Sequence, residues 1–271
     1  MGAFNKTACA WTKGPVKRYV LFGTMAALAG SLLATCSGPK NDITSAIKML
    51  AEKDNYGWTA TVEGTDGSGG RFRHGLTEGK TEKHGFTVLF TTARTNTFEV
   101  VLKGGQGVIK TPDGWKTLAE ASAGDGGQRN PYRSVTRIFQ NFKVPAAQAE
   151  DLVAKAKRLK KSDDAYTGNL TEEAVKELLA LGARPGGEVL NELLALGARV
   201  VGRAASARGN AKGSVKFWIK DGLLVKYEVK VQGTINPNGK DVYFDRTRTV
   251  EVKDIGTTKV EVPDEAKNKL F

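Results

Sequence analysis

Cysteine and histidine are scarce in this chain of 271 residues, which has two of each. The cysteines are Cys9 and Cys36, and the histidines, His74 and His84, stand ten residues apart, each beside a glycine in a polar stretch. Metal sites and Cys–His nucleophile pairs need several such side chains at suitable spacing. We therefore predict surface histidines, no metal site, no cofactor and no catalytic residue, and we do not expect an enzyme.

Nucleotide-binding and hydrolase motifs are also missing. The segment "GGQGVIKT", residues 104–111, does not fit the phosphate-loop pattern, because Ile109 stands where glycine should precede Lys110. "DGSGG", residues 66–70, lacks the G-x-S-x-G spacing of a nucleophile elbow. The 32 glycines fall mostly in short clusters between apolar runs, which is typical of turns in a β-rich fold.

Acidic residues are absent from the first 35 positions, where the charged residues are Lys6, Lys13, Lys17 and Arg18. Residues 19–34, "YVLFGTMAALAGSLLA", carry no charge and are mostly apolar. A basic segment followed by an apolar run is typical of a secretory signal peptide. The run is shorter than the ~20 apolar residues of a membrane-spanning helix, although an uncleaved anchor is the alternative.

The end of this run, "LATC" at residues 33–36, resembles the bacterial lipobox, with Thr35 where glycine or alanine is usual. The resemblance implies a diacylglycerol on the Cys36 sulfur and cleavage before this residue. Residues 1–35 would then be a lipoprotein signal peptide and residues 36–41 a tether. The alternative is ordinary cleavage near Ala27–Ala29, which would leave the apolar "GSLLA" exposed.

A lipoprotein leader bears on redox chemistry and on location. Removal of Cys9 would leave one thiol in the mature chain, which excludes an internal disulfide. Acyl chains on Cys36 would make the membrane a partner. Ser37 follows the cysteine where aspartate would signal inner-membrane retention. We therefore expect a protein anchored on the periplasmic face of the cell envelope, with the outer membrane favoured.

The rest of the chain is basic. Without the four basic residues of the leader, the 41 Lys and Arg fall to 37 against 29 acidic residues, a net charge of +8. Such a surface favours anionic partners or serves solubility alone, and export argues against nucleic acid. One basic cluster either contacts anionic headgroups or is the solvated end of a helix: Lys155, Lys157, Arg158, Lys160 and Lys161.

The first half of the mature chain has mostly strand periodicity. Apolar spacing predicts a helix over 42–53, with Asp42 as its N-cap, and then a strand with Trp58, Ala60 and Val62 on one face. Residues 71–85 are polar and predict an edge strand or a loop. Four short apolar runs between 85 and 118, separated by turn residues, predict an antiparallel meander.

The middle of the chain has a helical period. Tyr132, Val135, Phe139 and Phe142 share one helix face, and residues 146–159 predict a second helix. "ELLALGAR" occurs at 177–184 and again at 192–199, which indicates a local duplication within a helical hairpin. We expect a helical block over about 131–204 inside a single domain, 42–271.

The last third returns to strands. In "KGSVKFWIKDGLLVKYEVKVQG", residues 212–233, a three-residue loop Lys220–Gly222 would pair Val215 with Tyr227 and give one apolar face. "GTTKVEVP", residues 256–263, predicts a last strand, and "DEAKNKLF" a short tail. The order of elements predicts an α+β fold, an antiparallel sheet with one solvated face and helices covering the other.

Two arginines interrupt the pattern of "VYFDRTRTVEV", residues 242–252. Arg246 and Arg248 share a strand face with Val242, Phe244 and Val250. Either a bulge turns the middle of the strand, or two cations point toward the covered side. We favour the bulge, because a buried unpaired arginine is very costly. Inward-pointing arginines would suit a carboxylate or phosphate headgroup.

The order of these segments is similar to that of the LolA/LolB carriers of lipoproteins and the LprG/LppX lipid-carrier lipoproteins. The similar parts are the lipobox, the "GGQGVIKTPDGW" segment at 104–115 and the Asp-Gly hairpin with the strands that run to "VEVP", 215–263. The 15-residue repeat is a departure. The resemblance implies a curved half-barrel capped by helices, with an acyl-binding cavity between them.

A lipid carrier or sensor of this kind would bind its ligand between sheet and helices. The residues expected to line such a site are Phe139, Phe142, Leu178, Leu181, Arg246 and Arg248. The same apolar residues would equally form a filled core, because sequence does not show the shape of a pocket. The alternative is therefore a structural or protein-interaction lipoprotein without a ligand.

Overall fold

The computed structural model describes residues 38–65, 71–93, 96–123, 130, 132, 136, 139, 142–182, 207–235 and 241–271. These residues belong to one compact unit, Ser37–Phe271. The predicted leader and Cys36 lie outside them. No helix in the described segments is long and apolar enough to cross a membrane.

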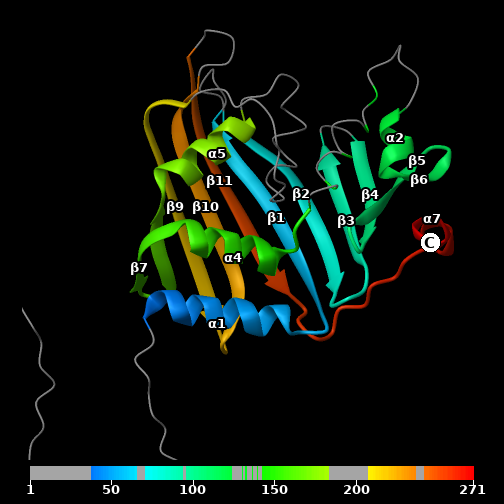
Figure 1. Ribbon diagram of the computed structural model, residues 1–271, viewed down its shortest axis with the longest axis horizontal. Helices are drawn as coiled ribbons and strands as arrows, with labels where there is room; N and C mark the ends of the chain where they lie inside the picture. The colour runs from blue at the N-terminus through cyan, green and yellow to red at the C-terminus, as the bar shows by residue number, and fades with distance from the viewer. Residues whose placement is uncertain are drawn as a thin grey trace, which may run out of the picture. The chain divides into compact units, whose positions relative to one another are not determined.

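Eleven strands form one open, curved antiparallel sheet (Figure 1). The first meander comprises β1 (Asn55–Thr65), β2 (Arg71–Glu82), β3 (Thr87–Ala93), β4 (Asn96–Lys103), β5 (Gln106–Thr111) and β6 (Gly114–Thr117). The second comprises β7 (Ala156–Ser162), β8 (Ala165–Leu170), β9 (Ala207–Lys220), β10 (Leu223–Ile235) and β11 (Val242–Lys253). Pairing of β1 with β11 joins the two meanders, so β6 and β7 are the sheet edges.

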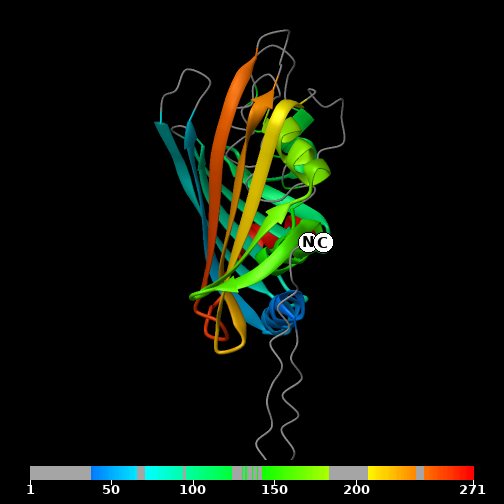
Figure 2. The same cartoon turned by 90° about the vertical axis from the view of Figure 1, so that its left-hand side faces the viewer.

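The short helix α2 (Leu118–Ala123) lies against one side of the sheet, since its Leu118 and Ala121 belong to the apolar cluster there. We call this side the covered face and define it by Trp58, Tyr227 and Val250. Three longer helices of the described segments lie against the same side. They are α1 (Pro39–Ala51), α4 (Pro145–Lys155) and α5 (Glu172–Gly182). α1 packs on α4, while α5 lies over β9 and β10. Figure 2 shows α1 and α5 on the same side of the sheet. The predicted α+β class with a curved antiparallel sheet is confirmed.

The first helix begins earlier than the sequence indicated. α1 starts at Pro39 with Gly38 as its N-cap, inside the segment expected to be a tether. The predicted N-cap Asp42 lies in the first turn, where its carboxylate accepts a hydrogen bond from the Tyr166 hydroxyl (3.1 Å). Proline at the first helical position has a fixed φ and lacks the N–H that a helix start leaves unbonded, which explains the earlier start.

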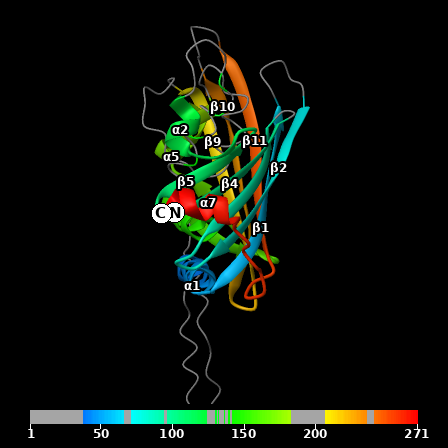
Figure 3. The ribbon, with the colours of Figure 1, turned by 90° about the vertical axis from the view of Figure 1, so that its right-hand side faces the viewer.

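One helix covers the opposite face, contrary to the prediction that helices cover one face only. α7 (Asp264–Leu270) packs on β5 and β6 (Figure 3), and residues 256–263 lead into it without forming the predicted last strand. The reason lies in the first meander, which is apolar on both faces. Val88, Val101 and Val108 point away from the covered face and form a second core with Trp115, Ala266 and Leu270.

The polar strand β2 is central rather than an edge strand or loop. It pairs with β1 on one side and β3 on the other. In the pairing of β1 with β2, Gly79 stands opposite Trp58. The Trp58 Nε1 donates a hydrogen bond to Thr81 Oγ1, which is also on β2 (3.3 Å). A strand with small and hydroxyl side chains leaves room for a buried indole and provides a partner for its N–H.

The segment expected to be helical contains a β-hairpin. α4 ends at Lys155, and β7 and β8 follow before α5 begins. The apolar spacing placed Leu159 on a helix face, but the β7–β8 register shifts between Lys157 and Lys160 and Arg158 has a φ of 54°. This bulge turns Leu159 over Gly168, where an added Cβ would lie 2.7 Å from a Leu159 methyl.

The β9–β10 hairpin has a two-residue turn, not the predicted three-residue loop. Asp221 and Gly222 have φ values of 52° and 76°, as a type I′ turn requires. A two-residue turn in an unbroken register would mix polar and apolar side chains on each face. A register shift at Val225 resolves this conflict, since Phe217 then pairs with Tyr227 and Val215 with Val229. All four are buried.

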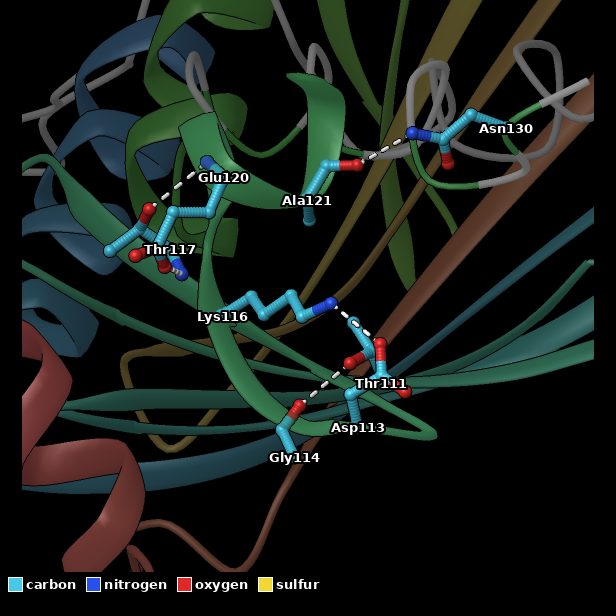
Figure 4. Close-up of polar contacts among 8 residues, drawn as sticks. All are labelled: Thr111, Asp113, Gly114, Lys116, Thr117, Glu120, Ala121 and Asn130. Atoms are coloured by element: carbon cyan, nitrogen blue, oxygen red, sulfur yellow. Dashed lines mark hydrogen bonds and ion pairs between the residues drawn. The ribbon is translucent and has the colours of Figure 1, made fainter. Parts of the chain in front are cut away.

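The "GGQGVIKTPDGW" segment forms the β4–β5 turn, β5 and the β5–β6 turn. Figure 4 shows Thr111 Oγ1 donating to the Gly114 carbonyl (2.8 Å) and Lys116 bonded to Asp113 (2.7 Å). The short helix α2 (Leu118–Ala123) then begins with a capping box: the Glu120 N–H donates to Thr117 Oγ1, and the Thr117 N–H to the Glu120 carboxylate. The segment is thus a pair of turns and strands.

Candidate functional site

The covered face holds one continuous apolar cluster that runs from α1 to α5. Under α1 and α4 this cluster is closed: Trp58, Tyr227 and Val250 are each 0% exposed. Along β11 the burial then falls, because Phe244, Arg246 and Arg248 share the face of Val250 but are only partly buried. The covered face is therefore less closed along β11 from Arg248 to Phe244 than it is at Val250.

The two arginines do point toward the covered face, so the predicted bulge is wrong. β11 pairs with β1 and β10 without a shift at these positions. Arg248 stands between Val229 of β10 and Val62 of β1, which are both buried. We predicted a bulge because an arginine that points inward would lack hydrogen-bond partners. Arg248 has such partners on α4 and β10.

Arg248 belongs to a three-residue network with neutral groups. Its Nη2 donates to Gln148 Oε1 (2.7 Å), and the Tyr227 hydroxyl donates to the same oxygen (2.7 Å). The Gln148 amide nitrogen donates to the Lys143 carbonyl, which fixes the orientation of the amide. Arg248 Nε is buried and has no hydrogen-bond partner. The network therefore leaves one buried donor of the guanidinium unfilled.

Burial shifts the pKa values of these groups. Desolvation raises the pKa of Tyr227 to about 12 and lowers the pKa of Arg248. It also lowers the pKa of Arg246 to about 10, and the Arg246 guanidinium lies 4.2 Å from the ring centroid of Phe244. Each shift disfavours the charged form, which is the response expected of groups that are removed from water.

The predicted apolar residues fall into two groups. Phe139 and Phe142 contact each other (ring centroids 6.4 Å apart), and Phe142 stacks on Trp58 at 5.9 Å. Phe139 is buried, while Phe142 is partly buried. Leu178 is partly buried on α5, over β9 and β10. The side chain of Leu181 lies outside the described residues.

Of the five cations in the basic cluster, Lys155 ends helix α4 and the other four lie on the edge strand β7. Lys155 pairs with Glu177 (2.6 Å), and the other four cations lie exposed on β7. Lysines on a free edge hinder pairing with other chains.

His84 is exposed in the β2–β3 turn with a φ of 59°, and the side chain of His74 is not described. Within the described ranges, no three His, Cys, Asp or Glu side chains gather as a metal site would need.

Gln148 and Tyr227 are the members of the site that the sequence did not reveal. Gln148 is buried on α4 in the row of Pro145, Ala149 and Leu152, which are buried too. A polar side chain on the apolar face of a helix indicates a buried hydrogen-bond network, because a buried amide needs hydrogen-bond partners. Its partner Arg248 stands 100 residues away, so no local pattern links them.

Solved structures resemble this fold, although no family model and no curated protein matches the sequence. Lipoprotein LppX from Mycobacterium tuberculosis is 11% identical, with 83% of this chain and 98% of that chain covered and a TM-score of 0.39. LprF from Mycobacterium bovis is 9% identical, with 84% and 97% covered and a TM-score of 0.38.

A LolA superfamily protein from Nitrosomonas europaea is 10% identical, with 84% and 96% covered and a TM-score of 0.31. The chain resembles LppX and LolA proteins. This likeness is to the same two groups of proteins that the order of segments resembles. At these identities and TM-scores the likeness says nothing of ligands or site residues, which rest on the covered face of this protein alone.

Proposed function

We propose that this chain is a lipid-anchored cell-envelope protein that binds a hydrophobic ligand on the covered face of its LolA-like sheet. It would act as a carrier or a sensor and not as an enzyme. The observation that carries the proposal is the fall in burial along β11, from Val250 at 0% exposed to the partly buried Arg248, Arg246 and Phe244. A bound chain would cover the ring of Phe244 and the apolar stems of the two arginines, whose contact with water is unfavourable.

Phe142 and Leu178 would contact the ligand, because both are partly buried at the border of the apolar cluster. Phe139 is a closed core residue and would support Phe142 from behind. Leu181 is proposed from the sequence alone. Contacts of this kind are non-directional, so they would accept acyl chains of varied length.

Ligand binding is tested by native mass spectrometry of the full chain after gentle extraction, and by titration of the stripped protein with a fluorescent fatty acid. Copurified lipid and saturable binding are expected. Leu178→Trp should weaken binding by filling the site, while the control Leu76→Trp, at an exposed position on β2, should not. A ligand-free mass together with no saturable binding would overturn the proposal.

A filled core is the second candidate, with a structural or protein-interaction role. It is favoured by the closed packing under α1 and α4, where Ile43, Leu50 and Phe217 are each 0% exposed. The outer face would then offer the binding surface. Its lysines are partly neutralised there, as in the pairs Lys226–Glu251 (2.8 Å) and Lys216–Glu228 (3.7 Å). The ligand-free outcome above is the result that this role predicts.

Lipidation at Cys36 has its own test. The intact mass of the membrane fraction should show a chain that begins with acylated Cys36, and Cys36→Ala should release or mislocalise the protein. Cys9→Ala is the matched control, because Cys9 stands in the predicted leader and its loss should change neither mass nor location. An unmodified chain, or one that begins elsewhere, would refute the anchor.

A further inference from the structure

Arg248 is a cation on an apolar face. Its strand neighbours on that face are Val250 along β11, Val229 across β10 and Val62 across β1. None of the ion pairs found among the described residues involves Arg248, and its hydrogen-bond partners are the neutral Gln148 and Tyr227. A guanidinium that is removed from water needs a countercharge or filled hydrogen bonds.

The acids on β11 and the neighbouring strands do not supply that countercharge: Glu63 and Glu228 stand one residue from the register partners of Arg248, Val62 and Val229, and so lie on the other face. Asp245 alternates with Arg246 along the strand, so it lies on the other face, where it bonds Gln232 (2.7 Å) and Lys230 (3.6 Å). Glu251 lies on that outer face as well and pairs with Lys226. Strand alternation therefore places these acids on one face and Arg248 on the other.

The geometry around Arg248 is that of a prepared anion site. Gln148 accepts from the guanidinium through Oε1 and is itself fixed through the Lys143 carbonyl, so Arg248 cannot rotate away without breaking its bond to an acceptor that is held in place. Nε remains as a buried donor without an acceptor. Arginine binds carboxylates and phosphates through paired N–H groups, and a fixed side chain loses little entropy on doing so.

We propose that Arg248 binds the anionic head of an amphiphile whose apolar chain lies on the covered face. The head is a carboxylate or a phosphate, held by the guanidinium beside Gln148 and Tyr227. Arg246, two residues along the same face, would add a second positive charge at the less buried end. This inference rests on the proposed function, since it names the class of hydrophobic ligand.

The test compares ligands that carry an anionic head with one that does not, and phosphatidic acid and diacylglycerol form the pair that differs only in the head. The stripped full chain is titrated with a long-chain fatty acid, with phosphatidic acid, with diacylglycerol of matched chains and with inorganic phosphate. Arg248→Gln should weaken fatty acid and phosphatidic acid binding at least tenfold and leave diacylglycerol binding unchanged. Arg158→Gln is the control, because Arg158 is exposed on β7, and it should change none of them.

The outcomes separate this inference from the proposed function. Equal loss for charged and neutral ligands, or no loss for either, overturns the role of Arg248 while the carrier function stands. No binding of any amphiphile overturns both. If inorganic phosphate binds and Arg248→Gln abolishes this binding, the anion site is supported, and the anionic head alone is sufficient for binding.

A second variant guards against misfolding of Arg248→Gln. Gln148→Glu would place a carboxylate where Gln148 Oε1 now lies 2.7 Å from Arg248 Nη2. This internal countercharge should compete with an anionic head, so fatty acid binding should weaken while diacylglycerol binding stays. Unchanged fatty acid affinity in a folded Gln148→Glu protein, as judged by circular dichroism, contradicts the inference.

Discussion

The indole ring of Trp58 lies directly over Gly79, so that a Cβ on Gly79 would stand 2.1 Å from Trp58 Cε2. The two residues face each other across the β1–β2 pair. The ring is held on its other side by Phe142, at 5.9 Å and nearly parallel. The missing side chain at position 79 is thus what allows a fully buried tryptophan in the middle of the sheet.

Gly79→Ala should destabilise the fold, because the added methyl overlaps a ring that cannot move away. Overpacking of this kind costs about 1–3 kcal/mol, which chemical denaturation would measure as a lower midpoint. The matched control is Gly57→Ala, also in β1–β2 register, where an added Cβ would meet its nearest atoms at 3.5 Å. Equal stability of the two variants would show that Trp58 has another position.

Gly222→Ala should weaken the β9–β10 hairpin. The residue has a φ of 76°, where a Cβ is crowded by the backbone and costs about 1–2 kcal/mol. Asp221→Asn is the control: residue 221 also has a positive φ, 52°, which asparagine tolerates. Thermal unfolding should show a loss for Gly222→Ala only, and an equal loss in both would argue against the type I′ turn.

Gln148→Leu should destabilise the protein more than Tyr227→Phe does. The leucine removes the acceptor shared by Arg248 Nη2 and the Tyr227 hydroxyl, and each unfilled buried donor costs about 1–3 kcal/mol. Phenylalanine removes one donor and leaves Gln148 Oε1 bonded to Arg248. Denaturant midpoints of the two variants give the order, and the reverse order would refute the network.

Tyr227 should ionise late in the folded protein. Burial raises its pKa from 10.0 to about 12, so the neutral phenol stabilises the fold below pH 10. That contribution is lost as the pH rises from 10 to about 12, because the unfolded chain releases the proton first. Burial also raises the pKa values of Tyr56 and Tyr166, so Tyr227→Phe should make the late phase of phenolate absorbance smaller and denaturant should abolish it. A late phase of unchanged amplitude in Tyr227→Phe would contradict this assignment.

The edge strand β7 should be protected by its charges. Replacing Lys160 and Lys161 with valine would leave an apolar free edge next to solvent, and such edges pair with other chains. Light scattering should then show self-association that grows with concentration. Lys216→Val on the outer face of the central strand β9 is the control and should stay monodisperse. Association of the control alone would contradict a special role of the edge.

Much of the fold was available from the sequence because its signals are local. Alternation placed Trp58, Ala60 and Val62 on one buried face, and short turns between apolar runs gave the meander β3–β6. Side-chain period and turn chemistry act over a few residues, so each strand can be recognised without knowledge of its partners.

The errors arose where distant segments decide the local structure. Leu159 has helical spacing but lies in β7, since the bulge at Arg158 packs it over Gly168. The tail 264–271 became α7 because the first meander is apolar on both faces and needs a second cover. The hairpin register depended on a shift at Val225, which only the packing of Phe217 and Tyr227 explains.

The sequence by itself determined the alternating strands, their turns and the presence of Arg246 and Arg248 in one strand. Only the tertiary structure decided where those arginines point. An inward arginine is unfavourable in isolation, and it becomes tolerable when α4 brings Gln148 within 2.7 Å from 100 residues away. A strand shows which residues share a face, but the cost of burying them depends on what the rest of the chain places there.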